Sequence, residues 1–503
     1  MLASVATFTI EGVGSRQVTV EVDVRRGLPT FTLVGLPDRA IRESRERVRA
    51  ALLNSGLDFP QQRLTVNLAP AHVRKAGPGF DLAIAVGVLA ATGQVPQEPL
   101  ATCALYGELS LAGTLRPGRG ALAVALGARD GGYARLAVPP GDAGEAALVE
   151  EVEVFPVADL KEIAELLRGE RAPARARPRR RAAGTGAGLD LADVRGQDDA
   201  KRALEIAAAG GHNMLMVGPP GAGKTMLARR LPGILPPPTF DEALEITRIR
   251  GVAGLGGGGL AAERPFRAPH HTISPQGLVG GGPTPRPGEV TLAHRGVLFL
   301  DELAEFARPA LDALRQPLEE GRVEIMRGQR TIEFPARAMV VAATNPCPCG
   351  RRADDCTCDA LLLGRYARRL SGPLLDRIDL VCRLGQVAPL ELVRDDKAAG
   401  SSREVRERVL AARERQRHRL ARTSALCNGD MDGRLTRRTV RTDGGVRSRL
   451  LSLPDADLLS GRGHDRVLRV ARTIADLDGR DRLAERDLDE ALAYRVGGVG
   501  VAA

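Results

Sequence analysis

The chain has 503 residues, of which 43% are hydrophobic, and it carries a formal net charge of +10 at pH 7. This length predicts two to four domains, each with enough apolar residues to bury a core. Apolar runs stay below the ~18 residues that cross a bilayer, and the first residues lack the basic and apolar regions of a signal peptide. A cytoplasmic protein with no membrane partner is therefore expected.

The positive charge favours a polyanionic partner such as nucleic acid. It also fits a coding bias, because nearly all basic residues are arginine and because alanine and glycine are abundant. Tryptophan is absent and other aromatic residues are few. Stacking of bases on an aromatic platform is therefore not the expected mode of binding.

Residues 1–167 alternate segments typical of strands and helices. Residues 17–24 have the period of two of a half-buried strand, and a second strand is predicted at 64–68. Helices are predicted at 42–54 and 81–91, which makes this region an α/β domain with its own core. Residues 168–188 are rich in Arg, Pro, Gly and Ala, a composition that predicts a basic, solvated linker.

An apolar strand at residues 213–217 leads into the pattern G-x-x-x-x-G-K-T, after which a helix begins. In this setting glycines let backbone N–H groups surround phosphates, and the helix N-terminus adds its dipole. Lys224 is expected to reach the β- and γ-phosphates of ATP, and the Thr225 hydroxyl to bind Mg²⁺. The predicted nucleotide-binding residues are Gly218, Pro219, Pro220, Gly221, Ala222, Gly223, Lys224, Thr225 and Met226.

Two further predicted strands end in polar residues that suit ATP hydrolysis. Residues 296–300 lead to Asp301, expected to hold Mg²⁺ through water, and to Glu302, expected to polarise the attacking water. Residues 338–344 lead to Asn345, which is predicted to orient that water; a turn residue before Pro346 is the alternative. Together with the phosphate-binding loop, these elements predict a P-loop AAA+ ATPase core over residues 189–388.

Two arginines follow in the order expected for the same module. Arg377 stands where many AAA+ proteins carry a finger that reaches the γ-phosphate of a neighbouring subunit. Arg462, within the mostly helical region 389–503, resembles the residue called sensor 2. A finger that acts on a neighbour implies a homo-oligomeric ring, with six subunits expected.

Four of the seven cysteines cluster within a short segment, as Cys347, Cys349, Cys356 and Cys358. In a cytoplasmic chain such a cluster favours metal or redox chemistry over structural disulfides. Four thiolates suit tetrahedral Zn²⁺, whereas the C-x-C spacing is tighter than the usual C-x-x-C. Bound zinc and free thiols are therefore both open.

The Gly- and Pro-rich stretch 251–288 is expected to be mostly loop or hairpin, and it is the predicted DNA-contacting element. Within it, Arg267, His270 and His271 are candidates to contact DNA phosphates. The alternative is that the two histidines pack inside the protein or cap a turn.

Several motifs are similar to those of a known family and occur in the same order along nearly the whole chain. They are P-F-R-A-P-H-H-T at 265–272, P-R-P-G-E at 285–289, the strand and acidic pair at 296–303, N-P-C-P-C-G at 345–350 and L-S-G-P-L-L-D-R-I-D at 370–379. The sequence therefore resembles the magnesium-chelatase-like AAA+ ATPases called YifB or ComM.

This resemblance implies an N-terminal Lon-protease-like α/β domain, a central AAA+ module of the magnesium-chelatase type and a C-terminal helical lid. It also implies a hexameric motor on single-stranded or branched DNA that promotes branch migration during natural transformation. Gly79 stands where Lon carries its catalytic serine. Without a nucleophile no acyl-enzyme can form, so the domain is expected to be non-proteolytic.

Two other functions are alternatives to a DNA motor. One is a magnesium-chelatase motor subunit that drives metal insertion into a porphyrin. The other is a protein-remodelling AAA+ chaperone or protease, of which the absence of a serine at Gly79 disfavours the proteolytic form.

Overall fold

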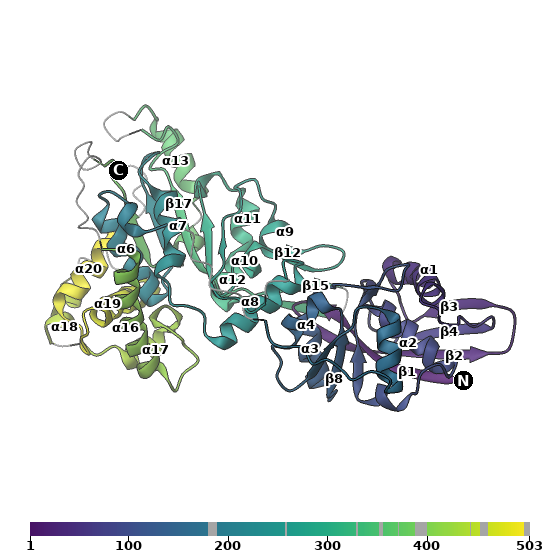
Figure 1. Ribbon diagram of the computed structural model, residues 1–503. Helices are drawn as coiled ribbons and strands as arrows, with labels where there is room; N and C mark the ends of the chain where they lie inside the picture. The colour runs from purple at the N-terminus through teal and green to yellow at the C-terminus, as the bar shows by residue number, and fades with distance from the viewer. Residues whose placement is uncertain are drawn as a thin grey trace.

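The computed structural model describes residues 1–179, 189–256, 259–327, 330–351, 356–370, 372–387, 400–442, 444–452 and 461–496. In Figure 1 the described chain forms an elongated molecule of two lobes, with the N-terminal lobe in purple and blue. The lobes meet where α3 (Ala121–Asp130) packs against α8 (Phe240–Val252). At this junction the Gly120 N–H donates to the Gly251 carbonyl at 3.1 Å.

A four-stranded sheet forms one part of the N-terminal lobe. Its order is β1 (Leu2–Glu11), β2 (Gly14–Arg25), β4 (Arg63–Ala69) and β3 (Thr30–Val34), and only the β3–β4 pair is parallel. Helices α1 (Arg39–Asn54) and α2 (Asp81–Ala91) accompany it. Every residue of α2 is buried; ten of its eleven residues are apolar, and the first, Asp81, pairs with Arg47 at 2.8 Å. The predicted strands and helices of this region are confirmed.

The rest of the N-terminal lobe is built on a parallel sheet of β5 (Cys103–Leu105), β8 (Arg135–Val138) and β9 (Glu153–Pro156). Helices α3, α4 (Pro140–Ala146) and α5 (Leu160–Arg168) belong to the same part, and β6 (Glu108–Leu109) and β7 (Leu115–Arg116) form a small ladder. Parallel pairs need long crossover connections, which the helices supply.

The first half of the predicted linker does not extend freely into solvent. The Ala176 N–H donates to the Val154 carbonyl at 2.8 Å, and Arg175 pairs with Glu153 at 2.6 Å. Arg171 pairs in the same way with Glu162, so two arginines of the stretch contact carboxylates of the N-terminal lobe while residues 171–179 stay largely exposed to solvent. The linker over 168–188 stays a prediction. Residues 180–188 lie outside the described part of the chain.

The second lobe is organised around a five-stranded parallel sheet. Its order is β11 (Phe266–Arg267), β14 (Val297–Leu300), β17 (Met339–Thr344), β10 (Met214–Val217) and β18 (Leu380–Arg383). The central strands are short and almost wholly buried, as expected for a sheet covered on both faces. The helices of this lobe are α6 (Asp198–Gly210), α7 (Lys224–Ile234), α8, α10 (Glu289–Leu292), α11 (Arg308–Ala313), α12 (Arg315–Glu320), α13 (Ala360–Arg369) and α14 (Gly372–Leu375).

The described residues of the Gly- and Pro-rich stretch, 251–256 and 259–288, contain the end of α8 and otherwise only short elements, as predicted. They are β11, α9 (Pro275–Val279) and the two-residue strands β12 (Gly280–Gly281) and β13 (Arg286–Pro287). A longer hairpin of β15 (Arg322–Arg327) and β16 (Arg330–Pro335) was not predicted from the sequence. Its Phe334 is buried in the core, whereas Met326 near the tip is 78% exposed.

Beyond β18, the described parts of the chain are helical. They contain α16 (Ser402–Leu420), α17 (Gly433–Thr439), α18 (Gly444–Leu451), α19 (Gly461–Leu477) and α20 (Glu485–Val496). Helices α16 and α19 pack against α6, and their apolar side chains share one core with the β10 side of the sheet. None of the described helices combines the length and the apolar character that would span a membrane.

Candidate nucleotide site and cysteine cluster

The predicted phosphate-binding loop connects β10 to α7, which begins at Lys224. Gly223 has φ of 91°, a conformation that favours glycine. The ammonium group of Lys224 donates to the Pro219 carbonyl and to Asn345 Oδ1, both at 3.0 Å, and to the Gly218 carbonyl at 2.5 Å. Burial lowers the pKa of Lys224, against the opposing effect of nearby carboxylates. The lysine thus lies folded over the loop, beside the end of β17.

The end of β14 brings the predicted acidic pair to the same place. The Thr225 hydroxyl donates to Asp301 Oδ2 at 2.7 Å, so the two predicted Mg²⁺ ligands are in direct contact. Glu302 follows with φ of 52°, a left-handed conformation that is uncommon outside glycine and is often found at functional sites. Its N–H donates to Asp301 Oδ1 at 3.0 Å.

Asn345 is held from two sides at the end of β17. Its side chain accepts from Lys224, and its backbone carbonyl accepts from the Tyr366 hydroxyl at 3.1 Å. Tyr366 lies on α13 and also contacts Thr344 Oγ1 at 3.0 Å. The structure therefore brings together Lys224, Thr225, Asp301 and Asn345, as the sequence predicted.

The three predicted DNA-contacting residues each have a partner within the chain. Arg267 forms a two-point ion pair with Glu289, at 2.6 and 2.7 Å. His270 Nδ1 lies 2.9 Å from Thr272 Oγ1. His271 Nδ1 lies 3.1 Å from Glu302 Oε2, at the predicted catalytic carboxylate. This last contact was missed from the sequence.

Parallel pairing explains why His271 meets Glu302. Strands β11 and β14 are neighbours, so the segments that follow them emerge at the same edge of the sheet. His271 follows β11 and Glu302 follows β14. A strand of two residues leaves no periodic pattern in the sequence. The contact between His271 and Glu302 therefore becomes visible only from the pairing of β11 with β14 in the structure.

Arg377 lies at the opposite end of the sheet from the phosphate-binding loop. It precedes β18, and its carbonyl accepts from the Asn213 side chain, which precedes β10, at 3.0 Å. Its guanidinium pairs with Glu319. The structure therefore does not bring Arg377 to Lys224 of the same chain. The side chain of Arg462, in the first turn of α19, lies outside the described part of the structure.

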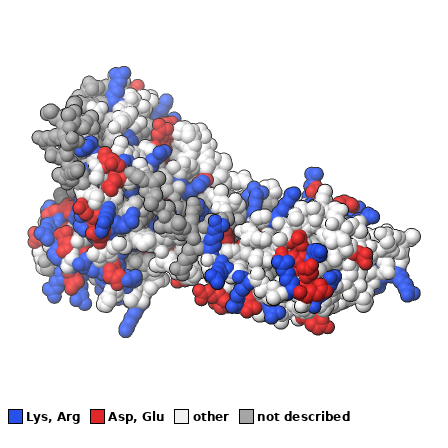
Figure 2. Space-filling model, in the orientation of Figure 1, with Lys and Arg blue, Asp and Glu red and all other residues white. Residues whose placement is uncertain are grey.

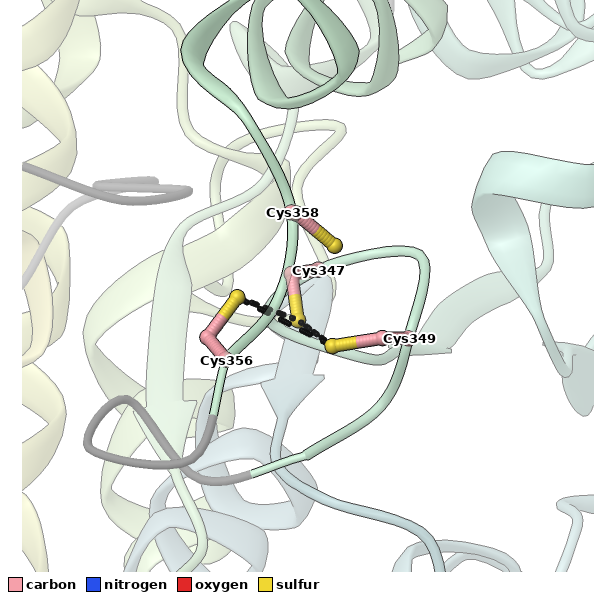
Figure 3. Close-up of side chains that lie close together, drawn as sticks. All are labelled: Cys347, Cys349, Cys356 and Cys358. Atoms are coloured by element: carbon pink, nitrogen blue, oxygen red, sulfur yellow. Dashed lines mark hydrogen bonds between the residues drawn. The ribbon is translucent and has the colours of Figure 1, made fainter.

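The four clustered cysteines lie in the loop between β17 and α13 (Figure 3). None of them forms a disulfide, and their sulfur atoms all lie within 4.8 Å of one another. Backbone N–H groups, first that of Arg351, donate to Cys349 and lower the pKa of its thiol to about 6. Burial raises the pKa of Cys347 to about 12. Zinc fits the donor type and the spacing of this cluster.

Gly79 lies buried against Tyr106 in the N-terminal lobe. A Cβ atom added at residue 79 would lie 2.4 Å from Tyr106 Cε2. The ring thus fills the space that a serine side chain would need, which agrees with the expectation of a non-proteolytic domain.

Curated proteins similar to this chain span nearly its whole length. YifB, an uncharacterised protein of Salmonella typhimurium, is 42% identical over 502 residues, which is 98% of this chain and 97% of that protein. The competence protein ComM of Haemophilus influenzae is 42% identical over 501 residues, with the same coverage. This chain belongs to the YifB/ComM family.

Three family models match this YifB/ComM member in succession. They are described as subunit ChlI of Mg-chelatase at residues 20–142, magnesium chelatase subunit ChlI at 190–392, and the ChlI C-terminal region at 399–495. The magnesium-chelatase-like prediction is thereby confirmed. A partial similarity, 31% identity over 141 residues, links 26% of the chain to 25% of Lon protease 2 of Bacillus subtilis. The Lon-like nature of the N-terminal lobe stays a prediction.

Proposed function

We propose that this YifB/ComM-family protein is an ATP-dependent hexameric motor that promotes branch migration of single-stranded or branched DNA, as in natural transformation. The observation that carries the ATPase part is the convergence of Lys224, Thr225, Asp301, Glu302 and Asn345 at one edge of the parallel sheet. These are the donors and carboxylates that phosphoryl transfer to water requires.

Each of these side chains has a separate task in the proposed site. Residues 218–226 surround the phosphates of ATP, with Lys224 exchanging its loop carbonyls for phosphate oxygens. Thr225 and Asp301, already 2.7 Å apart, would hold Mg²⁺, which when bound would supply positive charge to the phosphates. Glu302 accepts the proton of the attacking water, and Asn345 orients that water.

The active sites of the proposed ring lie between subunits. Arg377 is far from the phosphate-binding loop of its own chain, since it lies at the amino edge of the sheet and the loop at the carboxyl edge. A role at the γ-phosphate therefore requires a second copy of the chain. Arg462 is assigned to the sensor 2 position by its place in the sequence alone.

DNA as the substrate is supported by the name of the competence protein ComM and by the net charge of +10. Basic and acidic side chains are intermingled over both lobes on the face in Figure 2, so the charge is not gathered in one patch there. The β15–β16 hairpin, whose Met326 is 78% exposed, joins Arg267, His270 and His271 as a candidate contact.

The test is ATP hydrolysis by the full chain alone and with single-stranded, duplex or four-way-junction DNA, followed by a branch-migration assay on the junction. Stimulation by branched or single-stranded DNA, and ATP-dependent movement of the junction, are expected. Lys224→Ala should abolish both. Hydrolysis that no DNA stimulates would contradict the DNA motor but not the ATP site.

A magnesium-chelatase motor subunit is the second candidate, because all three matching family models carry the ChlI description. It predicts ATP-dependent insertion of Mg²⁺ into a porphyrin when chelatase partner subunits are added, without stimulation by DNA. The proteolytic alternative is opposed by Tyr106, whose ring leaves no room for a nucleophile at residue 79.

A further inference from the structure

The four clustered sulfur atoms have nearly the spacing of a single tetrahedral metal centre. Cys349 and Cys356 sulfurs are 3.7 Å apart, Cys356 and Cys347 3.6 Å, and Cys347 and Cys349 3.2 Å. Zinc–sulfur bonds of about 2.3 Å place tetrahedral sulfurs about 3.8 Å apart. A disulfide requires about 2.05 Å, well below each of these distances.

The backbone of the loop is ordered around these sulfurs. The Gly350 N–H donates to the Cys347 carbonyl at 3.1 Å, and the backbone N–H groups of Arg351 and Thr357 lower the pKa of the Cys349 thiol. Such donors around metal-bound thiolates offset their negative charge and fix their orientation. Gly350 has φ of 66°, so the turn between the first two cysteines and the rest of the loop favours glycine.

The kind of donor selects the metal. Four soft thiolates without oxygen or nitrogen donors suit zinc, rather than the hard cations magnesium and calcium. All four sulfurs lie within 4.8 Å of one another, which fits one ion and leaves no room for the inorganic core of an iron–sulfur cluster. Figure 3 shows the four side chains gathered in this way at one end of the loop.

This cysteine loop is packed against the proposed nucleotide site. It starts directly after Asn345, and a Cβ atom added at Gly350 would lie 2.9 Å from Pro220 Cγ of the phosphate-binding loop. Its other end leads into α13, where the side chain of Asp359 caps the helix by accepting from the Leu362 N–H at 2.7 Å. The same helix carries Tyr366, which donates to the Asn345 carbonyl.

We propose that Cys347, Cys349, Cys356 and Cys358 bind one zinc ion, and that this centre positions Asn345 against Lys224 for ATP hydrolysis. The binding part stands on the sulfur geometry alone, whereas the positioning part rests on the proposed ATPase. Closing the loop with a metal fixes both chain segments that hold Asn345, the end of β17 and the start of α13.

The binding part is tested by metal analysis of the full chain purified without chelator. About one zinc per chain is expected, and Co²⁺ in its place should give the intense visible bands of a tetrahedral thiolate site. Cys356→Ser with Cys358→Ser should lose the metal, while Cys103→Ala, a buried thiol of the other lobe, should keep it. Zinc-free protein with four reactive thiols that gives no tetrahedral Co²⁺ spectrum would overturn the site, and so would stoichiometric iron.

If the double cysteine variant fails to fold, the Co²⁺ spectrum of the unaltered chain still tests the metal site. Zinc is first removed with a zinc-selective chelator, and the chelator is then removed before metal is added back.

The positioning part is tested by comparing kcat and KM for ATP before and after this removal. A loss of about ten-fold or more in kcat, with little change in KM and recovery on adding zinc, is expected. Unchanged kcat in zinc-free protein would overturn the positioning role. Glu302→Gln separates the proposals, since it should keep zinc while losing hydrolysis; zinc in a chain that never hydrolyses ATP would refute the proposed ATPase only.

Discussion

The carboxylate of Asp379 lies in a buried polar network between the parallel sheet and the C-terminal helices. Its Oδ1 lies 3.4 Å from Arg469 and 3.8 Å from Arg466, both on α19, and its Oδ2 lies 3.5 Å from His212. Oδ2 also accepts from the Asn213 N–H at 3.2 Å. Burial works to raise the pKa of Asp379, but His212 and Arg469 outweigh it and hold the pKa below its usual range.

Replacing Asp379 with Asn keeps the volume and an acceptor for Asn213 but removes the charge that compensates two arginines. Removing one partner of a buried ion pair costs about 3–5 kcal/mol. The side chains of Arg466 and Arg469 are only 8% and 16% exposed, so water can replace little of the lost interaction. With about 2–4 °C lost per kcal/mol for a region of this size, a loss of about 3 kcal/mol lowers the melting temperature by about 6–12 °C.

The assay is calorimetric melting of the full chain, with hydrogen exchange of α19 to identify the transition that contains this network. The chain has several cores, so one melting temperature cannot stand for all of them. Glu407→Gln is the control, because it breaks an exposed Arg403–Glu407 pair worth only about 0.3–0.5 kcal/mol. A shift for Asp379→Asn no larger than that of the control would refute the reasoning.

Three further changes test the candidate nucleotide site. Glu302→Gln is expected to keep ATP affinity but lower phosphate release by about 10²–10⁴-fold; unaltered release would remove Glu302 from the mechanism. His271→Ala, which removes the contact with Glu302, is expected to change kcat more than KM, and equal kcat in the variant and the unaltered chain would remove His271 from the mechanism. Arg377→Ala subunits mixed with Glu302→Gln subunits should recover part of the lost ATPase, and no recovery at any ratio would argue against a finger acting in trans.

The parts of the site that could be predicted depend on short-range signals. The strands β10, β14 and β17 are apolar runs that stop at a glycine, an acidic pair or an asparagine. The strands were recognisable from their own residues, whereas the roles of the acidic pair and the asparagine depended on their order after the phosphate-binding loop. Because carboxyl ends of parallel strands meet at one edge, Lys224, Asp301 and Asn345 had to converge once the sheet was parallel. The contact of Thr225 with Asp301 and that of Asn345 with Lys224 follow from the parallel arrangement of these strands.

The parts that could not be predicted depend on which segments become neighbours. His271 meets Glu302 only because β11 is the strand beside β14. The sequence between β15 and β16 is Gly-Gln rather than the Asn-Gly or Asp-Gly that marks a hairpin in a sequence. Tyr106 fills the space beside Gly79 from another element of the lobe. None of these pairings leaves a pattern along the chain.

His294 makes the stability of the second lobe depend on pH. The Arg337 N–H donates to its Nδ1 at 3.0 Å, and its Nε2 lies 3.0 Å from Glu245. The ring therefore accepts at one nitrogen and donates at the other, which requires the neutral form. Burial lowers the pKa of His294 and of the fully buried His212, although neighbouring carboxylates work against this.

The direction of the effect follows from where protons bind. Below about pH 6.5 the two histidines take up protons in the unfolded chain but stay neutral in the folded one. The contribution of the two histidines to the free energy of unfolding is therefore at its maximum above pH 6.5. It falls as the pH is lowered toward the folded-state pKa, by up to about 1.4 kcal/mol per histidine for each pH unit. Melting at pH 7.5, 6.5 and 5.5, at constant ionic strength, should show this fall, and His294→Gln should reduce it. If Glu245 instead held His294 charged, its pKa would be raised and His294→Gln would steepen the fall rather than reduce it.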